Sequence, residues 1–381
     1  MEFSFSPEEE AFQSIVRRFA QEELAPHYAR WDRGEPFPKE KLKAMAQVGL
    51  TGMRAPIEWG GQDASYVQCG IAAEEVGRAD FNCTLFLQIW NIWGELLRLA
   101  PSSLQKEWYP PLVSGEKIFA FALTEPDAGS DAAHIRTRAR REGDYYVLDG
   151  EKASITFAGQ ADVAVVFART GEEGARGISC LLVPLHLPGV SRSVYRSPGE
   201  RLTQRGSLFF SGVKVPATYL IGREGQGFYL AMGAFDFNRA IIGLCCLGAA
   251  LQSLEETVGY LKGRRAFGRP LATFQGVAFQ IAEHLTRLEA ARLLCYRALW
   301  LKDQGLPHVR EAAMAKWFSG MVAVDAIRAC IILHGHYGYS QDLPLEQRLR
   351  DVLGLEIGDG TPEIMKLIIA RETFGREYLP R

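Results

Sequence analysis

One carboxylate in this chain lies between two glycines, immediately before a predicted helix. Asp359 stands in the stretch "EIGDGTPEI", where Thr361 and Pro362 are residue types that favour an N-cap and a first helical position. Free backbone N–H groups at such a helix start can hold an anion or a ribose. Asp359 lies just upstream and is able to face whatever binds there, although the local sequence by itself favours a solvated loop acid.

A second polar loop follows a predicted strand, in the stretch "LTEPDAGSD". Gly129 and Ser130 expose backbone N–H groups there, while Thr124 and Ser130 add hydroxyls. Such a loop can cradle a phosphate or the polar edge of a ring. The alternative is an ordinary turn from strand to loop.

Arginines recur at a predicted helix end in "GRRAFGRPLATFQ", where Arg264 and Arg265 precede a Phe-Gly break and Gln275 follows it. The fixed fork of a guanidinium suits a pyrophosphate, and a solvated charge at the end of the helix is the alternative.

Three further polar residues crowd one helical stretch, "MGAFDFNRA". Asp236, Asn238 and Arg239 span less than one turn, so they can share one end of a groove, or they form a surface ion pair. Two histidines follow in "LHGHYGYS", but no acidic or Cys partner lies at ligand spacing. We therefore expect a glycine-rich turn there and no metal site.

The elements that must position these residues fall into three zones. Residues 1–117 read as helical, 118–227 as short β-rich runs separated by turn residues, and 228–381 as long helices. We expect a mainly α chain with a small antiparallel β-barrel or sandwich in the middle. These three ranges are the predicted domains.

Local signals refine the predicted elements. Ser6 and Pro7 followed by three glutamates predict a first helix, and Asp149-Gly150 in "VLDGEK" predicts a hairpin turn. Helical periodicity predicts the remaining C-terminal helices at residues 228–262, 271–304, 308–333, 344–354 and 362–378.

Composition limits the function classes. The 381 residues carry a net charge of −2 with no long basic run, which argues against a nucleic-acid partner. The seven cysteines form no CxxC pair and are expected to be buried in a reducing cytoplasm. The acidic start is not typical of a signal peptide, and we expect no membrane insertion because no apolar run approaches spanning length.

Taken in order, four motifs resemble the acyl-CoA dehydrogenase family over nearly the whole chain. They are "TEPDAGSD", "RRAFGRP…FQ", "HGHYGY" and "RDVLGLEIGDGTPEI". The resemblance implies an N-terminal helical domain, a middle β domain and a C-terminal four-helix bundle, assembled as a homotetramer. It also implies FAD as cofactor and α,β-dehydrogenation of an acyl-CoA, with electrons passed to an electron-transfer flavoprotein.

The resemblance also implies roles for individual residues. Asp359 falls on the position of the base that removes the α proton, while a β-hydride moves to flavin N5. A ribityl hydroxyl and the Asp359 N–H would form the oxyanion site. The implied cofactor contacts are Leu123, Thr124, Ser130, Ser154, Thr156, Arg264, Phe267, Gln275, His334, Gly335, Thr361 and Glu363. The implied substrate contacts are Ser130, Asp236, Asn238, Arg239, Gly360, Trp90 and Trp93.

This sequence departs from the family at the base. Most members carry Glu where this chain has Asp359, and Asp reaches roughly 1.5 Å less far. A shift of that size costs about 100-fold in rate unless something compensates. The second base position of some relatives is Asn238, which cannot take a proton, so Asp359 remains the candidate. Ser154 stands where a Trp often lies beside the flavin.

These departures favour a compact, α-branched or alicyclic acyl group, such as cyclohexanecarboxyl-CoA. A retracted carboxylate leaves space for a tertiary α carbon, and Trp90 and Trp93 leave little room for a long chain, unless these rings belong to the core. Two other functions stay open: an oxidase resembling nitroalkane oxidase, and a non-catalytic protein that binds acyl-CoA or acyl-carrier protein.

Overall fold

The computed structural model describes residues 4–379. The chain forms two compact units. The first comprises residues 1–35, 65–84 and 236–381, and the second comprises residues 36–64 and 85–235. Each unit draws on segments that are distant in the sequence.

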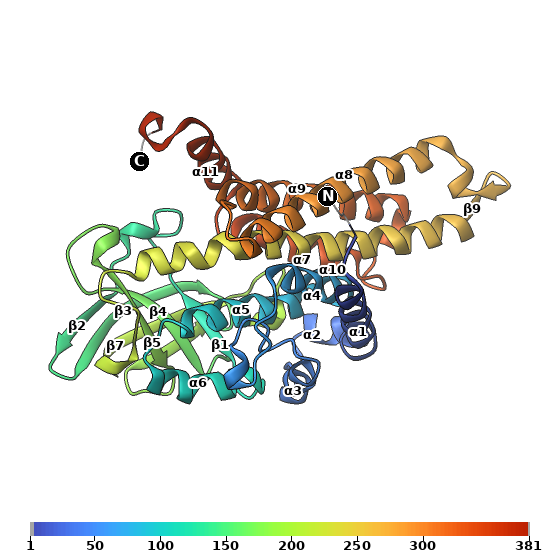
Figure 1. Cartoon of the computed structure of the whole chain (residues 1–381). Coiled ribbons are helices and arrows are strands. Elements are labelled where there is room, and N and C mark those ends of the chain that lie inside the picture. The colour runs from blue at the N-terminus through green and yellow to red at the C-terminus, as the bar shows by residue number, and fades with distance from the viewer. Residues whose placement is uncertain (1–3, 380–381) are drawn as a thin grey trace. The chain divides into compact units, whose positions relative to one another are not determined.

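The first unit is helical, and its C-terminal segment forms a bundle (Figure 1). The chain enters this bundle along α7 (Gly227–Gly263), whose residues from Asp236 onward belong to the first unit. The other α-helices of this unit are α1 (Pro7–Glu23), α2 (Tyr28–Asp32), α4 (Tyr66–Ala79), α8 (Gln275–Asp303), α9 (Val309–Leu333), α10 (Leu345–Ile357) and α11 (Pro362–Phe374).

The predicted start of α1 is confirmed. The Ser6 side chain accepts a hydrogen bond from Glu9 N, and the Glu9 side chain accepts one from Ser6 N in return, while Pro7 takes the first helical position. This reciprocal arrangement satisfies two backbone donors that a helix start leaves free.

Helices α4 and α7 approach each other backbone to backbone. A Cβ built at Gly77 would lie 2.6 Å from Cys245 O, and one built at Gly248 would lie 2.3 Å from Glu74 O. Glycine is therefore required at both crossings, because any larger residue would separate the helices. This close contact fixes α7, the helix that carries Asn238.

The break predicted between the first two bundle helices is a small β-hairpin. Strands β9 (Arg265–Ala266) and β10 (Arg269–Pro270) pair antiparallel at the far end of the α7–α8 pair (Figure 1). A 3₁₀ turn at Leu271–Thr273 follows, so α8 begins at Gln275 rather than at residue 271. The two glycines and the one proline of this stretch interrupt the helix.

Helix α7 corrects the expectation that no apolar run is long enough to cross a membrane. It has 37 residues, and its most apolar window has a mean hydropathy of 1.4, which meets that length and composition. However, 72% of this window is buried inside the protein, as is also found for the core helix of a soluble protein.

The second unit is built on an eight-stranded sheet, within the part of the chain that the structure describes. Its strand order is β6-β7-β3-β2-β4-β5-β8, and β1 adds on to β4. The strands are β1 (Phe119–Ala122), β2 (Arg138–Glu142), β3 (Tyr145–Ile155), β4 (Val163–Arg169), β5 (Ile178–Pro184), β6 (Val190–Val194), β7 (Gly206–Pro216) and β8 (Leu220–Ile221).

The sheet is mostly antiparallel, with two parallel pairings, β1 with β4 and β2 with β4. The helices of this unit are α3 (Lys39–Gln47), α5 (Thr84–Leu97), of which residues 85–97 belong here, and α6 (Ser102–Val113). The predicted order of a helical region, a β region and a second helical region is confirmed.

The hairpin turn predicted at Asp149-Gly150 is wrong. Both residues lie inside β3, at an irregularity in its pairing with β7, and the β2–β3 turn is at Gly143-Asp144. Gly150 has φ +142°, and a Cβ there would lie 2.7 Å from Thr137 Cα. Asp149 Oδ1 accepts a hydrogen bond from Gly212 N, so tertiary contacts override the local turn signal.

Candidate active site

The loop that carries Asp359 joins α10 to α11. Asp359 is half-buried and has φ +53°, in the left-handed region. Helix α11 starts as predicted, two residues after Asp359. Thr361 is the N-cap, its hydroxyl accepts a hydrogen bond from Ile364 N, and Pro362 follows in the first turn. The carboxylate is thus carried on a short segment held between two helices.

Helix α7 brings a second predicted group to Asp359. Asn238 Nδ2 donates to Asp359 Oδ2 at 3.0 Å, across a sequence separation of 121 residues. Arg239 donates to Asp236 Oδ1 at 2.7 Å and interacts electrostatically with Asp359. The structure therefore brings together the two motifs that the sequence placed at the base and at the CoA tail.

Two polar atoms beside Asp359 have no partner among the described protein residues. They are Asn238 Oδ1 and Arg239 Nε, in side chains that are 1% and 4% exposed. A buried polar group without a partner is costly, so such groups in a native protein are commonly completed by a ligand or water. Two orphaned atoms next to a carboxylate indicate a place for a polar ligand.

Burial shifts the pKa values of two charged residues near Asp359. Desolvation raises the pKa of Asp236 although Arg239 opposes the shift, and desolvation lowers the pKa of Arg239 although Asp236 and Asp359 oppose it. These groups lie in a medium less polar than water, where each charge acts more strongly on its neighbours.

Sequence reasoning missed one residue of this cluster. Lys316 of α9 is 3% exposed, and its Nζ donates to the carbonyl oxygens of Glu356, at 3.1 Å, and of Gly360. A single lysine in a helical stretch carries no motif. The one available signal was that Lys316 stands in a mostly apolar stretch, "EAAMAKWFSG". A lysine in such a stretch is expected to be buried, and lysines are rarely buried without a role.

In the second unit, the polar loop after β1 is tied to the end of β3. Lys152 Nζ donates to Leu123 O at 2.8 Å and to Glu125 Oε1 at 2.7 Å, and Ala153 N donates to Thr124 O at 2.9 Å. Lys152 is fully buried. The predicted flavin-contacting residues of the two segments are thereby held in one place.

The hydroxyls of this region fit a polar ligand. Among residues 4–379, the side-chain hydroxyls of Thr124, Ser130 and Thr156 make no hydrogen bond to protein, and none of the three residues is buried. Ser154 and Phe157, which bracket Thr156, have φ +57° and +66°. Non-glycine residues in this conformation concentrate at ligand sites. The donor set therefore suits the polar edge of a flavin ring.

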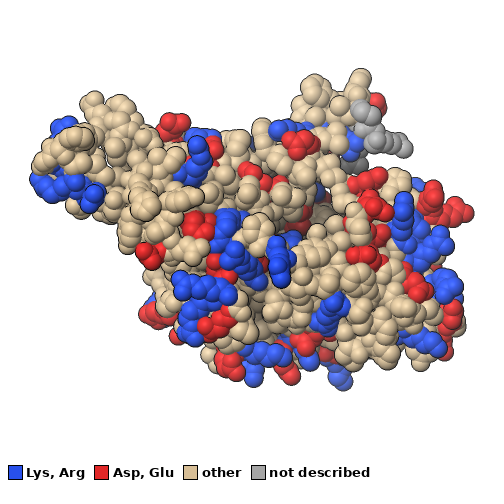
Figure 2. Space-filling model, turned by 180° about the vertical axis from the view of Figure 1, so that it is seen from behind, with Lys and Arg blue, Asp and Glu red and all other residues tan. Residues whose placement is uncertain are grey.

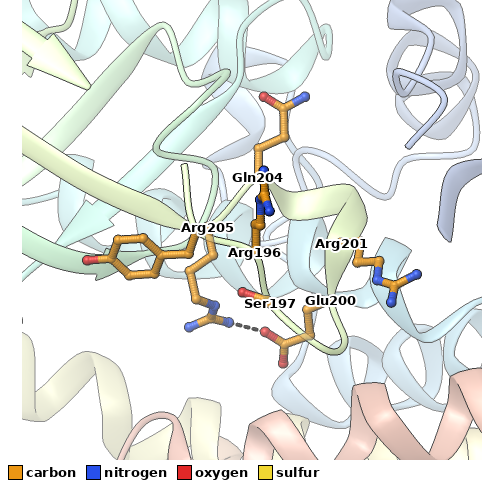
Figure 3. Close-up of a pocket in the computed structure, with 7 residues that line it drawn as sticks. Arg196, Ser197, Glu200, Arg201, Gln204 and Arg205 are labelled. Atoms are coloured by element: carbon orange, nitrogen blue, oxygen red, sulfur yellow. Dashed lines mark hydrogen bonds and ion pairs between the residues drawn. The ribbon is translucent and has the colours of Figure 1, made fainter. Parts of the chain in front are cut away.

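A cavity of about 290 Å³ adjoins this region, and sequence reasoning did not anticipate it. It is lined by Tyr195, Arg196, Ser197, Glu200, Arg201, Gln204 and Arg205 (Figure 3). Arg205 pairs with the buried carboxylate of Glu200 and donates to Ser154 O at 3.4 Å. The charge-dense stretch "YRSPGERLTQR" was the available signal.

The residues predicted to hold a pyrophosphate lie at the β9–β10 hairpin. Arg264, Phe267 and Gln275 are all exposed, and Phe267 is 94% exposed with φ +50°. Figure 2 shows Lys and Arg side chains gathered over this end of the helical bundle. Several exposed cations at one hairpin suit the charge of a pyrophosphate.

The other predicted cofactor contacts are arranged differently. His334 is buried, its ring stacks on Tyr260 with 4.2 Å between centroids, and its Nδ1 lies 2.9 Å from Cys330 O, so its side chain is engaged in the bundle. Gly335 begins a 3₁₀ turn with φ +63°. Glu363 is exposed and lies 3.8 Å from Lys366.

The two tryptophans of α5 are packed in the second unit. Trp90 is 1% exposed and stacks on Phe86, while Trp93 is fully buried and donates from Nε1 to Ala120 O at 3.1 Å. These contacts are those of core aromatics, with the polar edge of Trp93 satisfied. Whether either ring also lines an acyl pocket stays a prediction.

All seven cysteines are buried, as expected. Among residues 4–379, no three His, Cys, Asp or Glu side chains are grouped so that they could hold a metal ion.

Comparison with known proteins identifies the chain's relatives. Three family models match: acyl-CoA dehydrogenase N-terminal domain (residues 6–116), middle domain (120–213) and C-terminal domain (225–374). The short-chain specific acyl-CoA dehydrogenase of Clostridium acetobutylicum is 38% identical, over 98% of this chain and 100% of that protein. The mitochondrial isobutyryl-CoA dehydrogenase of Dictyostelium discoideum is also 38% identical, over 96% and 89%.

A solved structure agrees with these matches. The glutaryl-CoA dehydrogenase of Mycobacterium smegmatis, in complex with FADH2, has a TM-score of 0.92 at 28% identity, and the match covers 97% of this chain and 95% of that one. With three family models in order and full-length relatives, the chain belongs to the acyl-CoA dehydrogenase family and is an FAD-dependent oxidoreductase that acts on acyl-CoA.

Proposed function

We propose that this acyl-CoA dehydrogenase acts on a compact α-branched or alicyclic acyl thioester, with Asp359 as the base that removes the α proton. The observation that carries the proposal is the hydrogen bond from Asn238 to Asp359, beside two buried polar atoms without protein partners. It gives the carboxylate a fixed orientation next to a place that a ligand would complete.

Asp359 has the properties that a general base needs. It is half-buried, so a thioester can reach it, and the Asn238 amide holds Oδ2 while Oδ1 stays outside that bond. Arg239 brings a positive charge near this carboxylate. A carboxylate held in this way can accept the weakly acidic α proton of the thioester.

The proposed cofactor contacts fall into two sets. Thr124, Ser130 and Thr156 would bind the polar edge of the ring, and Arg264 and Gln275 would bind the pyrophosphate of FAD in a neighbouring subunit. When bound, FAD supplies the two-electron acceptor for the β-hydride. The chain's own part is to align the thioester and take its proton.

The shape of the substrate follows from the length of the base. An Asp carboxylate reaches roughly 1.5 Å less far than that of Glu, which leaves space for a bulky α carbon. The short-chain and isobutyryl-CoA relatives are equally similar to this chain at 38%, so identity does not choose between straight and branched substrates. Cyclohexanecarboxyl-CoA is the first thioester to test.

The test is anaerobic bleaching of the bound flavin by a panel of thioesters. We expect cyclohexanecarboxyl-CoA and isobutyryl-CoA to give higher kcat/KM than butyryl-CoA and octanoyl-CoA. A straight-chain thioester that exceeds every branched and cyclic one would refute the substrate proposal. Rapid reoxidation by air with nitroethane, without turnover of any thioester, would favour the oxidase alternative instead.

Further expectations concern assembly and partners. Helix α8 exposes Phe279 (64%), Leu285 (50%) and Trp300 (51%), an apolar face that supports self-association as a homotetramer. Light scattering of the purified protein would measure the number of subunits.

We also propose an electron-transfer flavoprotein as the electron acceptor, which is tested by reduction of that flavoprotein by the thioester-loaded enzyme. We propose the cytoplasm as the location, which is tested by cell fractionation.

A further inference from the structure

Lys316 is a buried cation about two turns after the start of α9. Its side chain is 3% exposed, and burial lowers its pKa to about 8, although the nearby negative charge of Asp359 opposes that shift. The lysine is therefore mostly charged at neutral pH. Burying a charged amine in a low-dielectric interior costs free energy. The amine stays charged only where its hydrogen bonds and neighbouring charges compensate for this cost.

Its hydrogen bonds span the loop that carries the base. Nζ donates to Glu356 O, within the last turn of α10, and to Gly360 O, immediately after Asp359. The last carbonyls of a helix have no partner within that helix, so the first bond caps α10. The second bond closes the loop, and one ammonium thereby fixes both ends of the segment between α10 and α11.

The charge of Lys316 also acts on the base itself. Asp359 is the strongest of its charged neighbours, and the interaction is reciprocal. The groups around Lys316 come from each element packed on α9. Those that act on its charge are Asp359 from the loop, Glu356 from α10, and Arg239 and Cys246 from α7. The titratable groups of the other two helices packed on α9 contact its neighbours instead: Cys295 of α8 bonds Ser319, and Lys366 of α11 lies over Trp317.

We propose that Lys316 is a positioning residue for α-proton removal: its ammonium group holds the Asp359 loop by both ends and places a positive charge near the carboxylate. The inference rests on the proposed role of Asp359. It gives α9, a helix in which the sequence shows no functional motif, a role in the chemical step. It also predicts that activity depends on a proton that stays on Lys316 throughout the reaction.

A purely structural role predicts different results. If Lys316 only capped α10, its neutral replacement would lower the unfolding temperature without changing the pH profile of the surviving enzyme. If it helped to bind the thioester, KM would rise while kcat stayed the same. A positioning role lowers kcat, leaves KM nearly constant and changes the pH dependence.

The experiment compares Lys316→Met and Lys316→Arg with the wild-type holoenzyme, using the best thioester from the panel. Arg328→Met is the matched control, because it removes an exposed cation from the same helix, about three turns away. Flavin absorbance and the unfolding temperature are recorded for each protein, so that loss of folding or of FAD is seen directly.

For Lys316→Met we expect kcat to fall about 100-fold with KM within about threefold, since the base loses the contact that holds its loop and is displaced. In the wild type, kcat should decline as pH rises through about 8, where Lys316 loses its proton. Lys316→Arg should keep most of the activity and lose this decline, because a guanidinium stays charged. Arg328→Met should match the wild type.

Two results would overturn the proposal. One is a Lys316→Met enzyme with normal kcat, and the other is a decline above pH 8 that persists unchanged in Lys316→Arg. If Lys316→Met does not fold, the wild-type and Lys316→Arg profiles still decide. Asp359→Asn separates this inference from the proposed function: if that variant bleaches normally, Asp359 is not the base, whereas its inactivity beside a normal Lys316→Met would reject only the role of Lys316.

Discussion

The Nδ2 atom of Asn238 lies 3.0 Å from Oδ2 of Asp359, so α7 and the α10–α11 loop share one hydrogen bond at the candidate base. The neutral amide orients the carboxylate without adding charge. Replacing Asn238 with Asp would place two carboxylates at this distance, and such a pair cannot readily hold two negative charges.

For Asn238→Asp we therefore expect the acid limb of the kcat/KM profile to move up by about one pH unit or more. The profile should be measured between pH 5 and 9 with flavin content held equal. Asn238→Ala provides the control, because it removes the hydrogen bond without adding charge and should lower kcat while leaving the limb closer to its original position. An unchanged limb in Asn238→Asp would show that position 238 does not contact the base in solution.

A longer base should change the preferred substrate. In Asp359→Glu the carboxylate reaches roughly 1.5 Å further, which crowds a tertiary α carbon but suits a straight chain. We expect the ratio of kcat/KM for cyclohexanecarboxyl-CoA to that for butyryl-CoA to fall at least about tenfold. Asp359→Asn, which keeps the size of the side chain, should retain FAD and lose bleaching. An unaltered ratio in Asp359→Glu would refute the link between the length of the base and the shape of the substrate.

The β9–β10 hairpin offers a test of cofactor binding across subunits. Phe267 is 94% exposed, so Phe267→Ala should leave the free energy of unfolding of the apoprotein within about 0.5 kcal/mol of the wild type. We expect the same variant to lose FAD on dilution, together with Arg264→Ala. FAD released on gel filtration measures this loss. Arg328→Ala is the control for loss of an exposed cation, and full retention of FAD by both hairpin variants would contradict the assignment.

The buried pair Lys152–Glu125 gives a prediction about stability. Lys152→Met leaves Glu125 buried without its cation, which should cost about 3–5 kcal/mol of unfolding free energy at pH 7. The double variant Lys152→Met, Glu125→Gln should recover part of that loss, because no charge is then buried. Urea unfolding at constant FAD loading measures both. A single variant as stable as the wild type would show that the pair contributes nothing.

The same lysine predicts the direction of a pH effect. Burial lowers the pKa of Lys152 to about 8, below its usual value of 10.5, so above pH 8 the folded state releases this proton while the unfolded state keeps it. Stability from this group therefore rises as pH increases from about 8 towards 10, by at most about 1.4 kcal/mol per pH unit. The slope of unfolding free energy between pH 8 and 9.5 should be smaller in Lys152→Met, and an equal slope would contradict the shift.

Much of the fold could be predicted because its signals are local. Helical periodicity located α9 to within one residue at its start, and Ser6 and Thr361 marked two helix starts by their capping hydroxyls. Asp149-Gly150 misled because a tertiary contact, Gly150 against Thr137, decided the backbone there. The local preference of Asp-Gly for a turn is weaker than the steric requirement that Thr137 imposes at Gly150.

The candidate site was harder to predict. Asp359 and Asn238 could be connected only through a family resemblance, because nothing local relates residues 121 positions apart. Lys316 and Arg205 were missed for the same reason: each acts through backbone carbonyls, of Gly360 and Ser154, and a carbonyl leaves no mark in the sequence. Contacts to the main chain become visible only in three dimensions.

The positive φ of Asp359 bears on which acids this position can hold. At +53° most side chains crowd the following carbonyl, whereas Gly, Asn and Asp are tolerated. Gly has no side chain and Asn carries no charge, so Asp alone combines a low steric cost with the ability to take up a proton. A saturation library at position 359 should thus return many folded proteins but very few active ones, and the backbone, as much as the substrate, would have selected the shorter acid.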